Sequence, residues 1–123
     1  MGNRVVHFEI HCPNLAAAKK FYSDVFDWQL SSCPGPQEYV LAKTGEPSER
    51  GIDGGMMPSK GGQPLVVNTL QVDNVDDAVK KVLANGGTMA LEKMPIPGIG
   101  WLAYCKDPGG NIFGMMHPDP NAK

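Results

Sequence analysis

The chain has 123 residues, of which 41% are hydrophobic and 20% charged, and its formal net charge at pH 7 is −2. This length fits one domain, or two small halves that share a core, and the slightly acidic balance excludes nucleic acid and anionic membrane as expected partners. The sequence shows no apolar run of transmembrane length and no signal-peptide pattern, and its three cysteines are widely spaced. We therefore expect a cytoplasmic protein with reduced thiols.

The first half of the chain predicts one strand, one helix and three further strands. In residues 4–10, apolar side chains alternate with polar ones, as in a half-buried strand. Asn14 is a suitable N-cap for a helix in residues 14–26, whose apolar positions recur every three or four residues. Short stretches at 28–31, 38–43 and 52–57, separated by proline and glycine turns, predict the three strands.

The second half predicts the same succession of elements. A strand ends at Val72, and Asn74 is a suitable N-cap with Asp77 three residues later. The sequence Asn-Gly-Gly at 85–87 indicates the end of this helix. Strands are predicted at 88–91, 101–105 and 111–117, and "KDPGGN" at 106–111 indicates a tight turn between the last two.

The two halves match each other in register. A shift of 60 residues places Asn14 on Asn74, and a shift of 59 places Gly55-Met56-Met57 on Gly114-Met115-Met116. These matches predict two βαβββ modules, over about 1–58 and 65–118, joined by a linker at 59–64 within one domain. Alternation along the last strands predicts that Met56 and Met115 face the helices, whereas Met57 and Met116 face the opposite side of the sheet.

Three segments carry a resemblance to a known family. The stretches "HFEIHCPNLAAAKKFYSDVFDW", "VDNVDDAVKKVLANGG" and "GWLAYCKDPGGNIFGMM" resemble the glyoxalase/bleomycin-resistance/dioxygenase proteins, the vicinal oxygen chelate superfamily. The resemblance implies an α+β fold in which two βαβββ modules form a curved eight-stranded mixed sheet with a concave pocket and helices on the outer face. It also implies a small-molecule ligand and a homodimer, with the pairing of modules within or between chains left open.

Enzymes of this superfamily hold a divalent metal through side chains of the first and last strands of each module. Carried over by position, His7 matches the first of these ligands, but its counterpart in the second module is Val67. The last-strand positions fall on Gly114 and on or beside Gly55, and neither glycine has a side-chain ligand. Because catalytic metal sites generally need about three protein ligands, we expect no cofactor and a degenerate metal site.

Two interpretations of the site stay open. The first is a metal-free small-molecule-binding protein, with His7 and Glu9 as contacts or as catalytic candidates. The second is a metal-dependent lyase, isomerase or dioxygenase, similar to lactoylglutathione lyase, in which a rearranged site combines His7 and Glu9 with Asp53 or His11. We interpret His117 as a solvated residue near the chain end. The candidate ligand contacts are His7, Glu9, Met57, Thr69, Trp101 and Met116.

Overall fold

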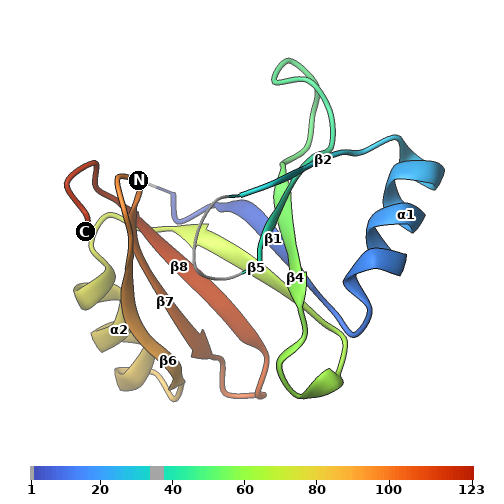
Figure 1. Ribbon diagram of the computed structural model, residues 1–123. Helices are drawn as coiled ribbons and strands as arrows, with labels where there is room; N and C mark the ends of the chain where they lie inside the picture. The colour runs from blue at the N-terminus through green and yellow to red at the C-terminus, as the bar shows by residue number, and fades with distance from the viewer. Residues whose placement is uncertain (1, 34–37) are drawn as a thin grey trace. The chain divides into compact units, whose positions relative to one another are not determined.

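A computed structural model describes residues 2–33 and 38–123 (Figure 1). The predicted turn at 34–37 lies outside the described residues. Within them, no helix is long and apolar enough to cross a membrane. The elements in chain order are β1 (Val5–Cys12), α1 (Leu15–Phe26), β2 (Gln29–Ser32), β3 (Val40–Lys43), β4 (Gly54–Pro58), a 3-10 turn (Lys60–Gly62), β5 (Leu65–Gln71), α2 (Val75–Ala84), β6 (Thr88–Ile96), β7 (Gly100–Lys106) and β8 (Ile112–Pro118).

The fold is the predicted α+β arrangement of two βαβββ successions. The eight strands form a mixed sheet in the order β2-β3-β4-β1-β5-β8-β7-β6, which has two edges and is therefore not closed. The pairs β1–β4 and β5–β8 are parallel, and the hairpin pairs are antiparallel. The chain divides into two compact units, a first unit of His7–Val67 and a second unit that combines Met1–Val6 with Asn68–Lys123. Each unit is described by itself.

In the first unit, α1 packs on one face of its strands. The buried core joins Cys12, Leu15, Val40 and Met56, with Tyr22 of the helix packed against it. Met56 is fully buried, which confirms that this methionine faces the helix. Neighbouring residues of a strand point to opposite faces. Because Cys12 faces α1, the side chains of His7, Glu9 and His11 in β1 lie on the face away from α1.

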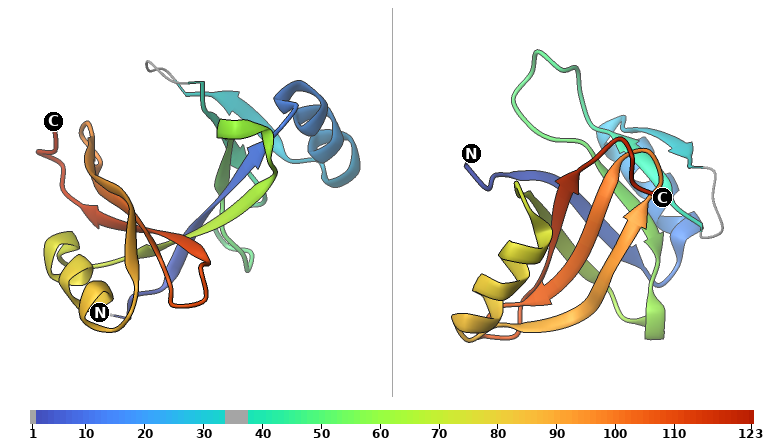
Figure 2. Two further views of the ribbon diagram at one scale, coloured as in Figure 1. Left: turned by 90° about the horizontal axis from the view of Figure 1, so that it is seen from below. Right: turned by 90° about the vertical axis from the view of Figure 1, so that its left-hand side faces the viewer.

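The second unit repeats this packing with α2 against β6, β7 and β8, as Figure 2 shows. Its core joins Val72, Val75, Ala103, Cys105 and Met115. The exposed fraction of Met115 is 3%, so the second methionine predicted to face a helix also does so. The two buried cysteines, one in each core, behave as small hydrophobic residues, because burial raises the pKa of both thiols.

Both helices begin at the predicted caps. The side-chain oxygen of Asn14 accepts a hydrogen bond from the amide of Ala17 at 3.0 Å, and Asn74 accepts from the amide of Asp77 at 3.0 Å. The second helix has an additional partner, because Nδ1 of His117 accepts from the amide of Val75 at 3.2 Å. The interpretation of His117 as a merely solvated residue is therefore wrong.

One strand is much longer than predicted. The sequence predicts a strand only at 88–91, whereas β6 continues to Ile96 with two irregularities in its pairing to β7. Pro95 lies within β6, which is an edge strand. A proline has no amide donor, and an edge strand tolerates this because one side of it has no neighbouring strand to bond. The other predicted helices and strands agree with the structure to within a few residues.

Candidate functional site

The polar side chains of β1 lie on the sheet face opposite α1. Glu9 pairs with Gly55 and His11 with Met57 in the parallel ladder to β4, and His7 precedes them by the same alternation. The residues between them, such as Ile10 and Cys12, belong to the core beneath α1. The local sequence thus forms a strand with one apolar and one polar face, and the polar face carries the candidate chemistry.

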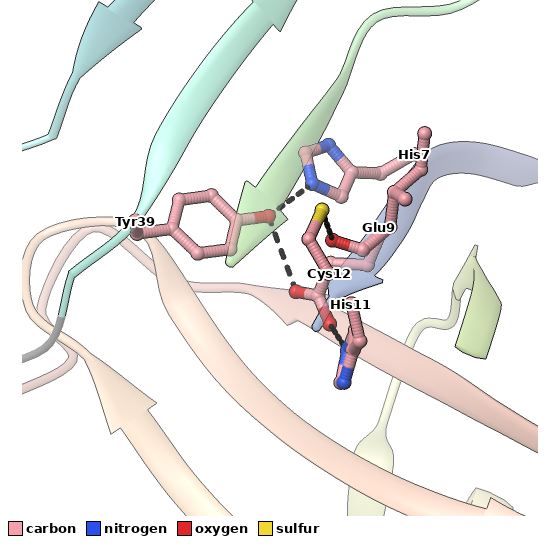
Figure 3. Close-up of polar contacts among 6 residues, drawn as sticks. His7, Glu9, His11, Cys12 and Tyr39 are labelled. Carbon is pink, nitrogen blue, oxygen red and sulfur yellow. Dashed lines mark hydrogen bonds and ion pairs between the residues drawn. The ribbon is translucent and has the colours of Figure 1, made fainter. Parts of the chain in front are cut away.

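A continuous chain of hydrogen bonds links these side chains (Figure 3). The hydroxyl of Tyr39 donates to Oε2 of Glu9 at 3.1 Å. Nε2 of His7 lies 2.8 Å from the same hydroxyl. At the other end, Nε2 of His11 lies 3.0 Å from Oε1 of Glu9. Both carboxylate oxygens of Glu9 therefore have partners within the first unit.

Burial makes this network energetically important. The exposed fraction of Glu9 is only 5%, whereas the two histidines and Tyr39 are half-buried. A carboxylate removed from water is stable only when it is hydrogen-bonded or paired, and Tyr39 and His11 supply these contacts. The arrangement presents a buried acceptor surrounded by side chains that remain partly accessible.

The glycine of the first Gly-Met-Met segment makes room for this network. A Cβ at Gly55 would overlap the hydroxyl and ring atoms of Tyr39. The phenol thus lies directly over the backbone of β4 and reaches across it to Glu9 and His7 on β1. Glycine permits this close approach because it has no side chain.

Burial also fixes the charge of His7. Desolvation lowers the pKa of its imidazole from the ordinary value of 6.5, and the negative charges of Glu9 and Asp53 oppose this shift only in part. Burial therefore favours the neutral imidazole of His7. Asp53 is itself held outside the network, since its Oδ1 accepts from the amide of Thr44 at 2.8 Å.

The donors present do not fit a divalent metal. In residues 2–33 and 38–123, no group of three or more His, Cys, Asp or Glu side chains is placed to hold one. Val67 is fully buried and cannot ligate, Gly55 has a phenol over it, and Gly114 lies against Thr69. The rearranged ligand sets of His7 and Glu9 with Asp53 or His11 are therefore not assembled in this structure.

The candidate residues of the second unit form a less polar surface. A Cβ at Gly114 would lie 3.0 Å from Oγ1 of Thr69 and 3.5 Å from the ring of Tyr104. In the β5–β8 ladder Thr69 pairs with Gly114, and Met116 follows two residues later on the same face. Thr69 is buried and Met116 is half-buried, like Met57 in the first unit. Thr69 and Met116 are thus near neighbours within their unit.

Trp101 lies apart from them. It packs against the buried core beneath α2, its ring N–H donates to Oδ2 of Asp119 at 3.1 Å, and Nζ of Lys93 lies 5.0 Å from its ring centroid. These contacts fit a structural anchor. Its role as a ligand contact stays a prediction from the sequence.

Tyr39 is the site residue whose role the sequence did not indicate. The residue is separated from His7 by 32 positions, so no local pattern in the sequence indicates their contact. The available signal was Gly55, since a glycine inside a strand indicates close approach by another group. The identity of that group depends on the pairing of β3 with β4.

Comparison with known proteins agrees with this geometry. A sequence model of the Glyoxalase/Bleomycin resistance protein/Dioxygenase superfamily matches residues 4–115. The chain belongs to this superfamily. The match spans both βαβββ successions, from β1 into β8, and therefore includes the whole polar network of the first unit.

Individual relatives are more distant. The putative glyoxylase CFP32 of Mycobacterium bovis and of Mycobacterium tuberculosis is 29% identical over 111 residues, which cover 87% of this chain but 42% of the relative. The chain thus spans less than half the length of these curated relatives.

Solved structures show the same fold at low sequence identity. Methylmalonyl-CoA epimerase from Mycobacterium tuberculosis has a TM-score of 0.69 and 15% identity, with 98% of this chain and 93% of that chain covered. Hypothetical protein BH1468 from Bacillus halodurans C-125 has a TM-score of 0.71 and 15% identity, with 100% and 99% covered. At these identities the likeness shows the fold alone.

Proposed function

We propose that this chain binds a small organic molecule on the polar face of its first unit, with His7 and Glu9 as central contacts and without a divalent metal. The observation that carries the proposal is the position of Tyr39, whose hydroxyl bonds to both His7 and Glu9. It occupies the space over Gly55, where the family resemblance implies a metal-ligating carboxylate. This internal hydrogen-bond network supports a ligand site that works without a divalent metal.

The composition of this face suits a ligand. Small-molecule sites combine apolar surface with a few converging polar groups. Here Met57 pairs with His11 and is half-buried, so a flexible apolar side chain lies beside the polar network. Thr69 and Met116 of the second unit stay candidate contacts from the sequence, as does Trp101.

The second candidate function is a metal-dependent lyase, isomerase or dioxygenase that uses His7 and Glu9. One observation favours it: the structure brings these two side chains to the same phenol oxygen. A metal at this point would have to break both bonds to Tyr39 and recruit a further donor, since two ligands seldom suffice for a catalytic site.

Native mass spectrometry of the full chain distinguishes the two functions. We expect no stoichiometric uptake of nickel, zinc, manganese or iron(II), and no change in metal content between the wild type and His7→Ala. One metal per chain, lost in His7→Ala but retained in the control variant His117→Ala, would overturn the proposal and establish the metal-dependent function.

The same spectra test the assembly. Homodimer formation and location in the cytoplasm stay predictions from the sequence and the family resemblance. We expect the mass of a dimer under native conditions, whereas a monomer at all accessible concentrations would contradict that prediction.

A further inference from the structure

We propose that Tyr39 and Glu9 hold the imidazole of His7 in a single tautomer, so that its Nδ1 accepts a hydrogen bond from an N–H or O–H group of the ligand. This inference rests on the proposed function and names the class of ligand that the site takes. Tyr39 is in this view a positioning residue, and His7 is the residue that touches the ligand.

The direction of each hydrogen bond follows from the chemistry of the groups. An ionised carboxylate only accepts, so the single proton of the Tyr39 hydroxyl is donated to Glu9. The hydroxyl oxygen then has lone pairs but no proton to offer His7. Nε2 of His7, 2.8 Å away, must therefore carry the proton and donate it to Tyr39. A neutral imidazole protonated on Nε2 has its lone pair on Nδ1.

Nδ1 of His7 is accessible to a ligand. Within the described part of the chain, the His7 ring forms one side-chain hydrogen bond, the one through Nε2 to Tyr39. The His7 side chain is only half-buried, so part of it remains accessible. Figure 3 shows Nδ1 on the side of the ring away from Tyr39.

The charges near His7 select the same kind of ligand. Glu9 and Asp53 both act on the imidazole as negative charges. A carboxylate or phosphate placed at Nδ1 would meet these charges and would find an acceptor instead of a donor. A neutral or cationic group with an N–H or O–H pairs with the lone pair and is attracted by the same field. The site therefore takes a hydrogen-bond donor at this position.

Nitrogen-15 NMR of histidine-labelled protein tests the tautomer directly. We expect His7 of the wild type at pH 7 to be neutral and protonated on Nε2, and Tyr39→Phe to give a mixture of tautomers. His117 is an internal control, because its Nδ1 accepts from the amide of Val75 and its tautomer should not respond to Tyr39→Phe. A wild-type His7 protonated on Nδ1, or a His7 unaffected by Tyr39→Phe, would overturn the proposal.

Three probes test the ligand class on the wild-type protein. Phenol offers an O–H donor, anisole has the same shape with that donor blocked, and benzoate is an anion. We expect phenol to shift the Nδ1 resonance of His7 several-fold more than either of the others. An equal shift with anisole or benzoate, or no shift with phenol at saturation, would overturn the donor assignment. Metal content measured on the same samples reports separately on the proposed function.

The variants remain informative if folding changes. Tyr39→Phe removes one oxygen and keeps the ring over Gly55, and the backbone amide spectrum reports whether the fold is kept. Glu9→Leu is the second variant, because it removes the acceptor of the Tyr39 hydroxyl proton, which can then be donated to Nε2 of His7. We expect this change to move part of the His7 population from protonation on Nε2 to protonation on Nδ1. A His7 that stays wholly protonated on Nε2 in Glu9→Leu would contradict the proposed chain of bonds.

Discussion

The two units share a scaffold but differ in the polarity of the face opposite the helix. Both have an asparagine N-cap and a buried methionine beneath the helix. At a shift of 60 residues, however, His7 and Glu9 of β1 correspond to Val67 and Thr69 of β5. The first unit carries a hydrogen-bond network on this face, and the second carries Thr69, Tyr104 and Gly114 in close contact.

The difference shows how one scaffold supports two kinds of surface. Helix packing depends on the alternate residues of each strand that face inward, and these are apolar in both units. The residues between them are free to vary, because they do not contact the helix. Chemistry can therefore change in one unit without loss of the fold, and the following predictions test this independence.

The largest expected effect distinguishes the two strand glycines. Gly55→Ala should lower the free energy of unfolding by about 1–3 kcal/mol, since its methyl group would overlap the phenol of Tyr39. Gly114→Ala should cost less, because the nearest atom is Oγ1 of Thr69 at 3.0 Å and a threonine hydroxyl can rotate away. Urea denaturation of both variants measures the two costs.

A double variant identifies the cause. In a Tyr39→Ala background, Gly55→Ala should have little further effect, because the overlapping ring is absent. The opposite result is that Gly55→Ala and Gly114→Ala lower the free energy of unfolding equally in the wild-type background. That result would show that the ring of Tyr39 is not the reason why position 55 requires a glycine.

The second prediction compares the buried polar residues at corresponding positions. Glu9→Gln should cost about 1–3 kcal/mol, because the carboxylate accepts from both Tyr39 and His11 and an amide oxygen can accept from only one side. Thr69→Val changes no charge and should cost less. Chemical denaturation compares them, and a larger loss for Thr69→Val would place the more important polar contacts in the second unit.

The third prediction concerns the helix caps. Asn14→Ala should cost about 1 kcal/mol, since α1 has no acidic residue in its first turn to replace the lost acceptor. Asn74→Ala should cost somewhat less, because Asp76 and Asp77 still stabilise the start of α2 and His117 still accepts from Val75. Thermal unfolding of the two variants checks which of them loses more stability. The double variant Asn74→Ala with His117→Ala should lose more stability than Asn14→Ala and so reverse the order.

The smallest effect is a pH dependence confined to the first unit. Because the pKa of His7 is lower in the folded protein than the ordinary 6.5, the unfolded chain binds a proton more readily. Above about pH 6.5, His7 is neutral in both states and its protonation does not change the free energy of unfolding. As the pH falls below about 6.5, protonation of His7 in the unfolded chain destabilises the fold, until the pH has passed the lower pKa of His7 in the folded protein. His7→Gln should therefore show a shallower loss of stability between pH 7 and about pH 5. Parallel pH profiles of the two proteins would contradict the shift.

Much of this architecture follows from local sequence patterns. Asn14 and Asn74 mark helix starts because their side chains bond to amides only three residues away. The turn at 106–111 is equally local, since Asp107 accepts from the amides of Gly109 and Asn111. The length of β6 was not predictable, because Pro95 argues against a strand unless the strand is known to be at an edge.

By itself, the sequence determined the two βαβββ successions and the inward-facing methionines. Periodicity and residue chemistry suffice for these, because each depends on neighbours in the chain. Only the tertiary structure brought Tyr39 over Gly55 and within bonding distance of His7 and Glu9. That contact joins β1, β4 and the residue just before β3 through the register of the sheet. Register is a property of pairing between distant segments that no single stretch of sequence contains.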